Sequence, residues 1–222
     1  MTTPTFEKVS RDPAFQEMFA RSRRRQLPRD QTVLAEGAKP TCLYFIMSGT
    51  VAVRLANRQG RDVLLAYMHA GDFFGEMGLL PGVKGRSAMV QTVTDCAVLE
   101  VTYPVFVELA TRHASLWMEL AGQLATRLRI TNRRLADMPV LPATERIWSV
   151  VSELARRSDA PHQDAAIPVR ITREDLGKLA GCSRELAGSV LRDLARNGRL
   201  ALQGHRILIP PESLAEAAPA ID

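Results

Sequence analysis

The segment with the clearest chemical potential is rich in glycine and lies before the middle of the chain. It runs from Gly71 to Leu80, and Arg86 and Ser87 follow it closely. Glycine lets a backbone turn sharply and approach a ligand, and one helical turn within 75–80 would direct free amide groups at an anion. Arg86 would add a planar guanidinium suited to phosphate, and Ser87 a hydroxyl donor. On its own this pattern is weak evidence for a phosphate site, because a purely structural turn has the same residue types.

Glu76 extends the chemistry of this segment. A carboxylate is repelled by phosphate, but it accepts hydrogen bonds from sugar hydroxyls. Glu76, Arg86 and Ser87 therefore suit a ligand that carries both a sugar and a phosphate.

A second segment carries residues suited to reading DNA. Residues 172–194 predict two short helices around a glycine turn, with Thr172 and Ser183 as their N-caps. In a helix-turn-helix, the N-terminal end of the second helix enters the major groove. There Arg184 could bond O6 and N7 of guanine, and Glu185 could accept from a cytosine amino group. A generic helical hairpin is the alternative.

The surroundings of this segment also suit DNA. Residues 168–209 contain eight Arg or Lys against four Asp or Glu, a net charge of +4, and such a charge favours an acidic partner. Residues 200–209 predict a β hairpin, or wing. The side chains expected to contact bases or phosphates are Arg173, Ser183, Arg184, Glu185, Ser189 and Arg192.

Short strands must position the glycine-rich segment. Apolar residues recur with a period of two, and turn signals separate the runs. This spacing is typical of an antiparallel sandwich or jelly roll, which by itself implies no ligand. A short helix begins before them at Asp12-Pro13, and the basic cluster at 21–25 is either a solvated face or a contact with DNA or a partner. The expected strands are 32–35, 43–47, 50–55, 63–68, 87–93 and 97–101.

A long helix is expected at 115–137, between two unlike halves of the chain. It lacks proline, and an apolar stripe runs along it at heptad spacing. The stripe could pack on the chain's own core or form a dimer seam, and the apolar residues outside it favour the seam. Thr131 also lies in the stripe and needs a hydrogen-bond partner. The predicted seam residues are Trp117, Ala121, Leu124, Leu128 and Leu135.

Composition excludes several classes of protein. The 222 residues are 46% hydrophobic with a net charge of +5, and no apolar run or leader pattern indicates a membrane or secreted protein. We therefore expect a cytoplasmic protein without a membrane partner. The three cysteines are far apart, which argues against a disulfide framework or metal site. The four histidines are scattered, so a metal-dependent cupin-type enzyme is not expected, and no metal or cofactor is predicted.

The motif Gly71-Asp72-Phe73-Phe74-Gly75-Glu76-Met77-Gly78-Leu79, followed by Arg86-Ser87-Ala88, resembles the phosphate-binding cassette of the cyclic-AMP receptor protein family of bacterial transcription regulators. The similarity extends from about Phe15 to Ile209. It implies that Glu76 binds the ribose 2′-hydroxyl. It also implies that Arg86 and Ser87 hold the cyclic phosphate, with nearby backbone amides for which Gly75 and Met77 are the candidates.

The resemblance also implies which residues contact the base of the nucleotide. Three residues of this chain depart from the family pattern. Thr131 would hydrogen-bond adenine, but Asn132 replaces the following serine, which the other subunit contributes in the family. Asparagine both donates and accepts, so it suits adenine or guanine. Ser189 replaces a second DNA-reading arginine. Pro142 stands where an aspartate commonly caps the next helix, and it is a candidate for the first residue of that helix.

The resulting prediction is an α+β protein with an N-terminal antiparallel β-roll (jelly roll). The expected divisions are a cyclic-nucleotide-binding domain at 1–110, a central dimerisation helix at 111–137, a hinge at 138–142 and a winged helix-turn-helix at 143–222. We expect a homodimeric transcription regulator, not an enzyme, that binds palindromic double-stranded DNA under the control of cyclic AMP. RNA polymerase is a further candidate partner. Alternatives are control by cyclic di-GMP or cyclic GMP, independence of any ligand, and a regulatory subunit that does not bind DNA.

Overall fold

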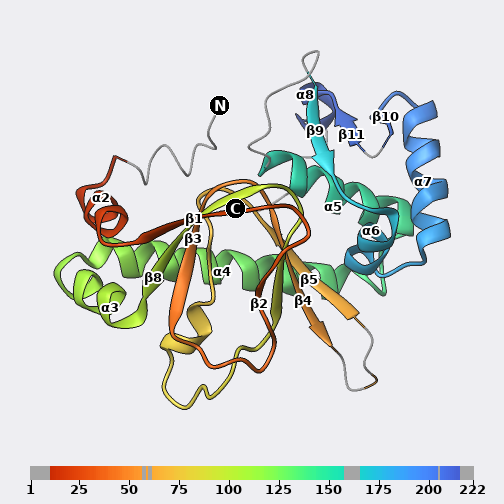
Figure 1. Cartoon of the computed structure of the whole chain (residues 1–222). Helices are drawn as coiled ribbons and strands as arrows, with labels where there is room; N and C mark the ends of the chain where they lie inside the picture. Colours follow the sequence, from red (N-terminus) through yellow and green to blue (C-terminus); the bar gives the residue numbers. More distant parts are fainter. Residues whose placement is uncertain (1–10, 57–58, 60–61, 158–165, 205, 216–222) are drawn as a thin grey trace. The chain divides into compact units, whose positions relative to one another are not determined.

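The structure is a computed structural model that describes residues 11–56, 59, 62–157, 166–204 and 206–215 (Figure 1). The chain divides into two compact units, at 2–129 and 130–222. The long helix α4 (Ala114–Asp137) begins in the first unit and ends in the second.

The first unit is built on two four-stranded antiparallel sheets. Their strand orders are β1-β8-β3-β6 and β2-β7-β4-β5. All six strands expected from the period-two pattern are present, which confirms the β-roll. The strands are β1 (Arg23–Leu27), β2 (Thr32–Leu34), β3 (Cys42–Ser48), β4 (Val51–Ala56), β5 (Asp62–Met68), β6 (Phe73–Phe74), β7 (Met89–Thr92) and β8 (Cys96–Thr102).

Alternation along β3 builds the core of this unit on both faces of one sheet. Leu43 and Phe45 are fully buried in a cluster that contains residues of helices α2, α3 and α4. Tyr44 and Ile46 point the other way, into the cluster between the two sheets. Successive side chains of a strand alternate between faces, so a single apolar strand here supplies both layers of the core.

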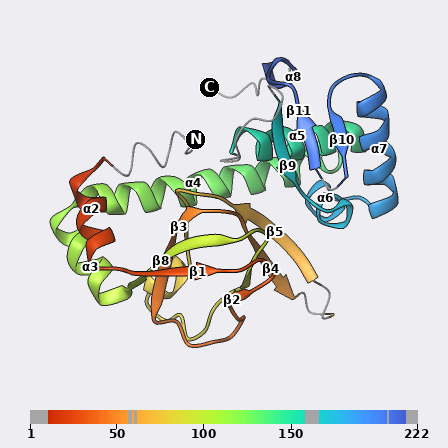
Figure 2. The ribbon, with the colours of Figure 1, turned by 45° about the horizontal axis from the view of Figure 1, so that its top comes forward.

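Three helices cover the outer face of that sheet (Figure 2). Helix α2 (Pro13–Ala20) begins as expected, since the Asp12 side chain accepts a hydrogen bond from the N–H of Ala14 at 2.8 Å. Helix α3 (Tyr103–Arg112) was not expected, and the single residue His113 separates it from α4. On α4, Leu116 and Leu120 are 0% and 4% exposed and face the core.

The seam predicted on α4 is exposed in this chain. Leu124, Leu128 and Leu135 are 37%, 62% and 60% exposed, and Ala121 and Thr131 are also exposed. The bulky side chain of Trp117 is 39% exposed, and it also makes an edge-on ring contact with Phe106 at 5.2 Å. α4 thus covers the chain's own core with one face and leaves an apolar stripe on another.

The basic cluster at 21–25 gives the largest correction to the expected elements. It contributes most of β1, which pairs with β8 as the edge strand of its sheet. Arg21 bonds Glu108 at 2.7 Å, and Arg25 bonds Glu100 at 3.0 Å. The strand was missed because arginines at an edge do not show the apolar alternation by which strands are recognised.

The second unit holds the helix-turn-helix and its wing. The strands β9, β10 and β11 form one antiparallel sheet in the order β10-β11-β9, as the predicted hairpin requires. Thr172 and Ser183 cap α6 and α7 through the N–H groups of Asp175 and Leu186, which confirms both predicted caps. The elements are α5 (Ala143–Arg156), β9 (Ile167–Arg170), α6 (Arg173–Ala180), α7 (Arg184–Arg196), β10 (Ala201–Gln203), β11 (Arg206–Ile209) and α8 (Pro211–Ala215).

The linker between α4 and α5 is tied to the turn of the helix-turn-helix by Arg146. Its Nε donates to the carbonyl of Ala180 at 2.8 Å, and its Nη1 donates to the carbonyl of Leu141 at 2.5 Å. Arg134 on α4 also bonds Glu153 on α5 at 2.9 Å. Pro142 is the N-cap residue of α5 rather than its first helical residue, because its ψ of 152° is extended.

Among the described residues, no helix combines the length and the apolar character that a membrane span requires.

Candidate functional site

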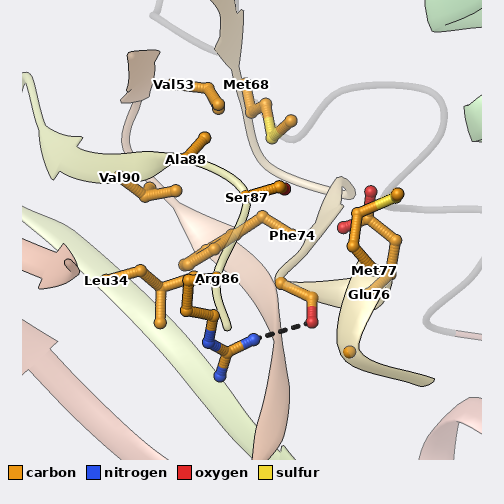
Figure 3. Close-up of a pocket in the computed structure, with 12 residues that line it drawn as sticks. Leu34, Val53, Met68, Phe74, Glu76, Met77, Arg86, Ser87, Ala88 and Val90 are labelled. Carbon is orange, nitrogen blue, oxygen red and sulfur yellow. Dashed lines mark hydrogen bonds between the residues drawn. The ribbon is translucent and has the colours of Figure 1, made fainter. Parts of the chain in front are cut away.

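An open hollow lies beside the glycine-rich segment (Figure 3). The empty space in it, with its open mouth included, is about 410 Å³. All five ligand-binding residues predicted from the first unit line it, namely Gly75, Glu76, Met77, Arg86 and Ser87. The other lining residues are small or apolar and are Leu34, Val53, Met68, Phe74, Gly78, Ala88 and Val90.

The backbone at Gly75 requires glycine for two reasons. Its φ of 79° is in the left-handed region, where it caps the 3₁₀ turn η1 (Glu76–Leu79). A Cβ at this position would also lie 2.8 Å from Nη1 of Arg86. The helical turn predicted within 75–80 is therefore confirmed, and glycine allows it to approach the guanidinium.

Arg86 is the buried cation of the hollow, with 8% of its surface exposed. Its Nη1 donates to the carbonyl of Gly75 and to the hydroxyl of Tyr103, both at 2.8 Å. Its Nη2 donates to the carbonyl of Cys42 at 2.7 Å. These acceptors are neutral, and no carboxylate of the described residues forms an ion pair with Arg86. The positive charge therefore remains available to an anionic ligand.

Glu76 lines the same hollow and is held from α4. Nη1 of Arg127 lies 3.4 Å from Oε1 of Glu76. One turn earlier on α4, the Gln123 side chain accepts from the N–H of Phe73 and donates to the carbonyl of Gly71, each at 2.8 Å. α4 thus fixes the backbone just before Glu76 and neutralises part of its charge.

Sequence reasoning missed four residues around the hollow, namely Cys42, Tyr103, Gln123 and Arg127. A signal existed for two of them, because Glu119, Gln123 and Arg127 follow one another at steps of four and therefore share one face of the helix. Gln123 indeed donates to Glu119 at 2.9 Å. Cys42 is the first residue of β3, and Tyr103 is the first residue of α3. Both lie far from Arg86 in sequence, so no local pattern marks them.

The two residues expected to contact the base belong to the second unit. Thr131 and Asn132 lie on α4 beyond residue 129, and both side chains are exposed. Their predicted contact with a nucleotide stays a prediction.

A second hollow lies at the start of α7, in the helix-turn-helix. It is lined by Arg173, Arg184, Glu185, Gly188 and Arg192. Four of the six residues predicted to contact DNA therefore share one face. Ser183 caps the helix without lining the hollow, and Ser189 is half-buried outside it.

Charge on this face suits hydrogen bonding to DNA. Three arginines surround the single carboxylate of Glu185 in the hollow. Its own backbone N–H and the Ser183 hydroxyl lower the pKa of the Glu185 carboxyl below its usual value. Glu185 is therefore an ionised acceptor at neutral pH, and the arginines around it are donors.

Two family models match this chain. The model described as "Cyclic nucleotide-binding domain" matches residues 24–113, and the one described as "Crp-like helix-turn-helix domain" matches residues 145–216. The first hollow lies in the first match and the second hollow in the second.

Relatives match over nearly the whole chain. The cAMP-activated global transcriptional regulator CRP of Salmonella typhimurium is 32% identical over 91% of this chain and 96% of its own length. The cAMP-activated global transcriptional regulator Vfr of Pseudomonas aeruginosa is also 32% identical, over 87% and 92%.

A solved structure agrees with these relatives. The c-di-GMP responsive global regulator CLP of Xanthomonas campestris is 29% identical with a TM-score of 0.72, over 89% of this chain and 98% of its own. These relatives are regulators of transcription and not enzymes. The chain therefore belongs to the CRP/FNR family of DNA-binding transcription regulators, with an N-terminal cyclic nucleotide-binding domain and a C-terminal Crp-like helix-turn-helix.

Proposed function

We propose that this chain is a homodimeric regulator that binds a palindromic DNA operator under the control of cyclic AMP. One observation carries the proposal: Glu76, Arg86 and Ser87 line a single hollow in a chain that also presents Arg184 and Glu185 at the start of a helix-turn-helix. The first set suits a ribose and a phosphate, and the second suits the edges of base pairs.

Cyclic AMP is the favoured ligand because the relatives CRP and Vfr are described as cAMP-activated. Thr131 and, from the second subunit, Asn132 are proposed to contact the purine. Asn132 suits guanine as well as adenine, so cyclic GMP is an alternative. Cyclic di-GMP is another, because the similar protein CLP is described as responsive to it. A regulator that needs no ligand is the remaining alternative.

The second copy is proposed to dock on the apolar stripe of α4. Trp117, Leu124, Leu128 and Leu135 are each at least 37% exposed, and heptad spacing suits a two-stranded coiled coil. A dimer would pair two recognition helices, which matches two half-sites one helical turn apart, about 34 Å.

Leu128→Asp is expected to convert this dimer to a monomer. In a free monomer, the change is mild because Leu128 is 62% exposed. In a seam it would bring two carboxylates together and remove two apolar contacts, so the dimer dissociation constant should rise by about 100-fold or more. Sedimentation equilibrium measures this constant.

Met118→Asp is the matched control, since Met118 is 72% exposed on the same helix but lies outside the stripe. It should leave the dimer intact. Equal dissociation of both variants, or a dimer that survives Leu128→Asp unchanged, would rule out this seam.

The signal would pass from nucleotide to DNA by preferential binding to the DNA-competent state. A complete switch from 1:99 to 99:1 requires about 10⁴-fold selectivity of the nucleotide for that state. Because the target is chromosomal DNA, a cytoplasmic location is proposed, with RNA polymerase as a further partner. No cofactor is proposed.

The test is a calorimetric titration of the purified protein with cyclic AMP, cyclic GMP and cyclic di-GMP, followed by operator binding at fixed salt. Cyclic AMP should bind in the micromolar range or tighter and raise operator affinity. Preferential binding of another nucleotide would reassign the ligand. Strong operator binding without any nucleotide binding would favour ligand independence, and no DNA binding under any condition would favour a regulatory subunit.

A further inference from the structure

Tyr103 is the first residue of α3, and its hydroxyl lies at the junction of two parts of the proposed phosphate site. It donates to the carbonyl of Gly75 at 2.7 Å and accepts from Nη1 of Arg86 at 2.8 Å. The guanidinium carbon of Arg86 lies 5.9 Å from the centre of the tyrosine ring, within the range of a cation–π contact. One side chain therefore contacts both the glycine turn and the buried cation.

These contacts determine which part of the guanidinium is left for a ligand. Arginine has five N–H donors, and Nη1 of Arg86 donates to both Gly75 and Tyr103. Nη2 donates to the carbonyl of Cys42 at 2.7 Å and lies 3.8 Å from the Sγ of the same residue. Within the described part of the chain, no acceptor bonds Nε. The edge of the guanidinium formed by Nε and Nη2 is thus the fork that suits two oxygens of one phosphate.

Packing holds the Tyr103 ring in this place. A Cβ at Gly78 would overlap the Tyr103 hydroxyl and also Cβ of Pro40. Glycine at 78 therefore leaves room for the phenol between η1 and Arg86. Burial raises the pKa of the Tyr103 phenol above its usual value, so the hydroxyl keeps its proton at neutral pH and can donate to Gly75.

We propose that Tyr103 is a positioning residue of the nucleotide site, which holds Nη1 of Arg86 so that the Nε/Nη2 fork faces the phosphate. This inference rests on the proposed function, because it assumes that the hollow binds a cyclic nucleotide. A residue that only filled space would act through its ring, whereas positioning of Arg86 needs the hydroxyl.

Tyr103→Phe separates these roles, because it keeps the ring and removes one oxygen. The variant should bind cyclic AMP about tenfold more weakly, since Nη1 loses an acceptor and the guanidinium gains freedom to rotate away from the phosphate. Tyr67→Phe is the matched control, because Tyr67 is buried in the same unit, with 4% of its surface exposed, but does not line the hollow. Its affinity for cyclic AMP should stay within about twofold of the original.

The decisive measurement adds Arg86→Lys in a double-mutant cycle, with all affinities from calorimetry. Lysine has no Nη1 for Tyr103 to hold, so Tyr103→Phe should cost less than about twofold in that background. An equal tenfold loss in both backgrounds, or a loss with Tyr67→Phe as large as that with Tyr103→Phe, would overturn the positioning role. So would a Tyr103→Phe protein that binds like the original.

A failure of the proposed function would give a different experimental result from a failure of the Tyr103 proposal. If the unaltered protein bound no cyclic nucleotide, the nucleotide site itself would be wrong and the role of Tyr103 with it. If the unaltered protein bound cyclic AMP and only the Tyr103 results disagreed, the nucleotide site would stand and the positioning role alone would be lost.

Discussion

Arg86→Leu should reduce cyclic AMP affinity by about 100-fold or more. Arg86 is the buried cation of the hollow, and its acceptors Gly75, Cys42 and Tyr103 are all neutral. Hydrogen bonds to a charged partner contribute about 1.5–3 kcal/mol each. Losing two such bonds to phosphate corresponds to roughly 10²–10⁴ in the dissociation constant. Calorimetric titration measures it directly.

Two comparisons make this result specific. Arg86→Lys keeps the charge but not the fork, so its affinity should fall between those of the original and the leucine variant. Ser87 is exposed at the same hollow, and Ser87→Ala should cost about tenfold or less because it removes one neutral hydroxyl. An Arg86→Leu protein that is folded by circular dichroism and binds with unchanged affinity would exclude the hollow as the phosphate site.

Arg184→Ala should abolish preference for the operator while leaving nonspecific DNA binding largely intact. Arg184 is exposed at the first position of α7, beside Glu185 and Arg173 in the second hollow. A two-bond contact with guanine discriminates by about 1–3 kcal/mol, and a dimer would lose it in both half-sites. The ratio of operator to random-DNA affinity should therefore fall by about 30-fold or more.

Salt dependence separates base reading from phosphate contact. Arg196→Ala is the control because Arg196 is exposed near the end of the same helix, bonds Asp193 at 2.9 Å and lies outside the hollow. It should leave the affinity ratio unchanged. Arg173→Ala should instead weaken binding to all DNA and lower the salt slope. If Arg184→Ala acted like Arg173→Ala, its assignment to a base would be wrong.

The order of elements was accessible from sequence where a local pattern carries the information. A continuous apolar run such as that of Cys42–Ser48 marks a strand buried on both faces, and a hydroxyl such as Thr172 before an apolar run marks a helix start. The glycines at 75 and 78 indicated close approach, and the structure shows Arg86 and Tyr103 as the groups approached.

Features that depend on partners distant in sequence were not accessible. β1 forms by backbone pairing with β8, where Arg25 also bonds Glu100, and no pattern near residue 25 reveals this partner strand. Tyr103 reaches Arg86 only because α3 starts where β8 ends. The hold of Arg127 on Glu76 likewise requires α4 to pass over the glycine-rich segment. Each is a tertiary contact between polar groups, and even where spacing marks a shared helix face, as for Gln123 and Arg127, it does not reveal the distant segment which that face contacts.

The contacts of Arg146 change how the proline linker works mechanically. A linker that holds Pro139 and Pro142 suggests a stiff joint between two bodies. Here Arg146 fastens the carbonyls on one side of that linker to the turn before the recognition helix, and Arg134 secures the end of α4 to α5. The last two turns of α4 therefore belong to the same compact unit as the recognition helix α7. A rotation of α4 beyond residue 130 would therefore rotate α7 with it, without any bend at Pro139 or Pro142.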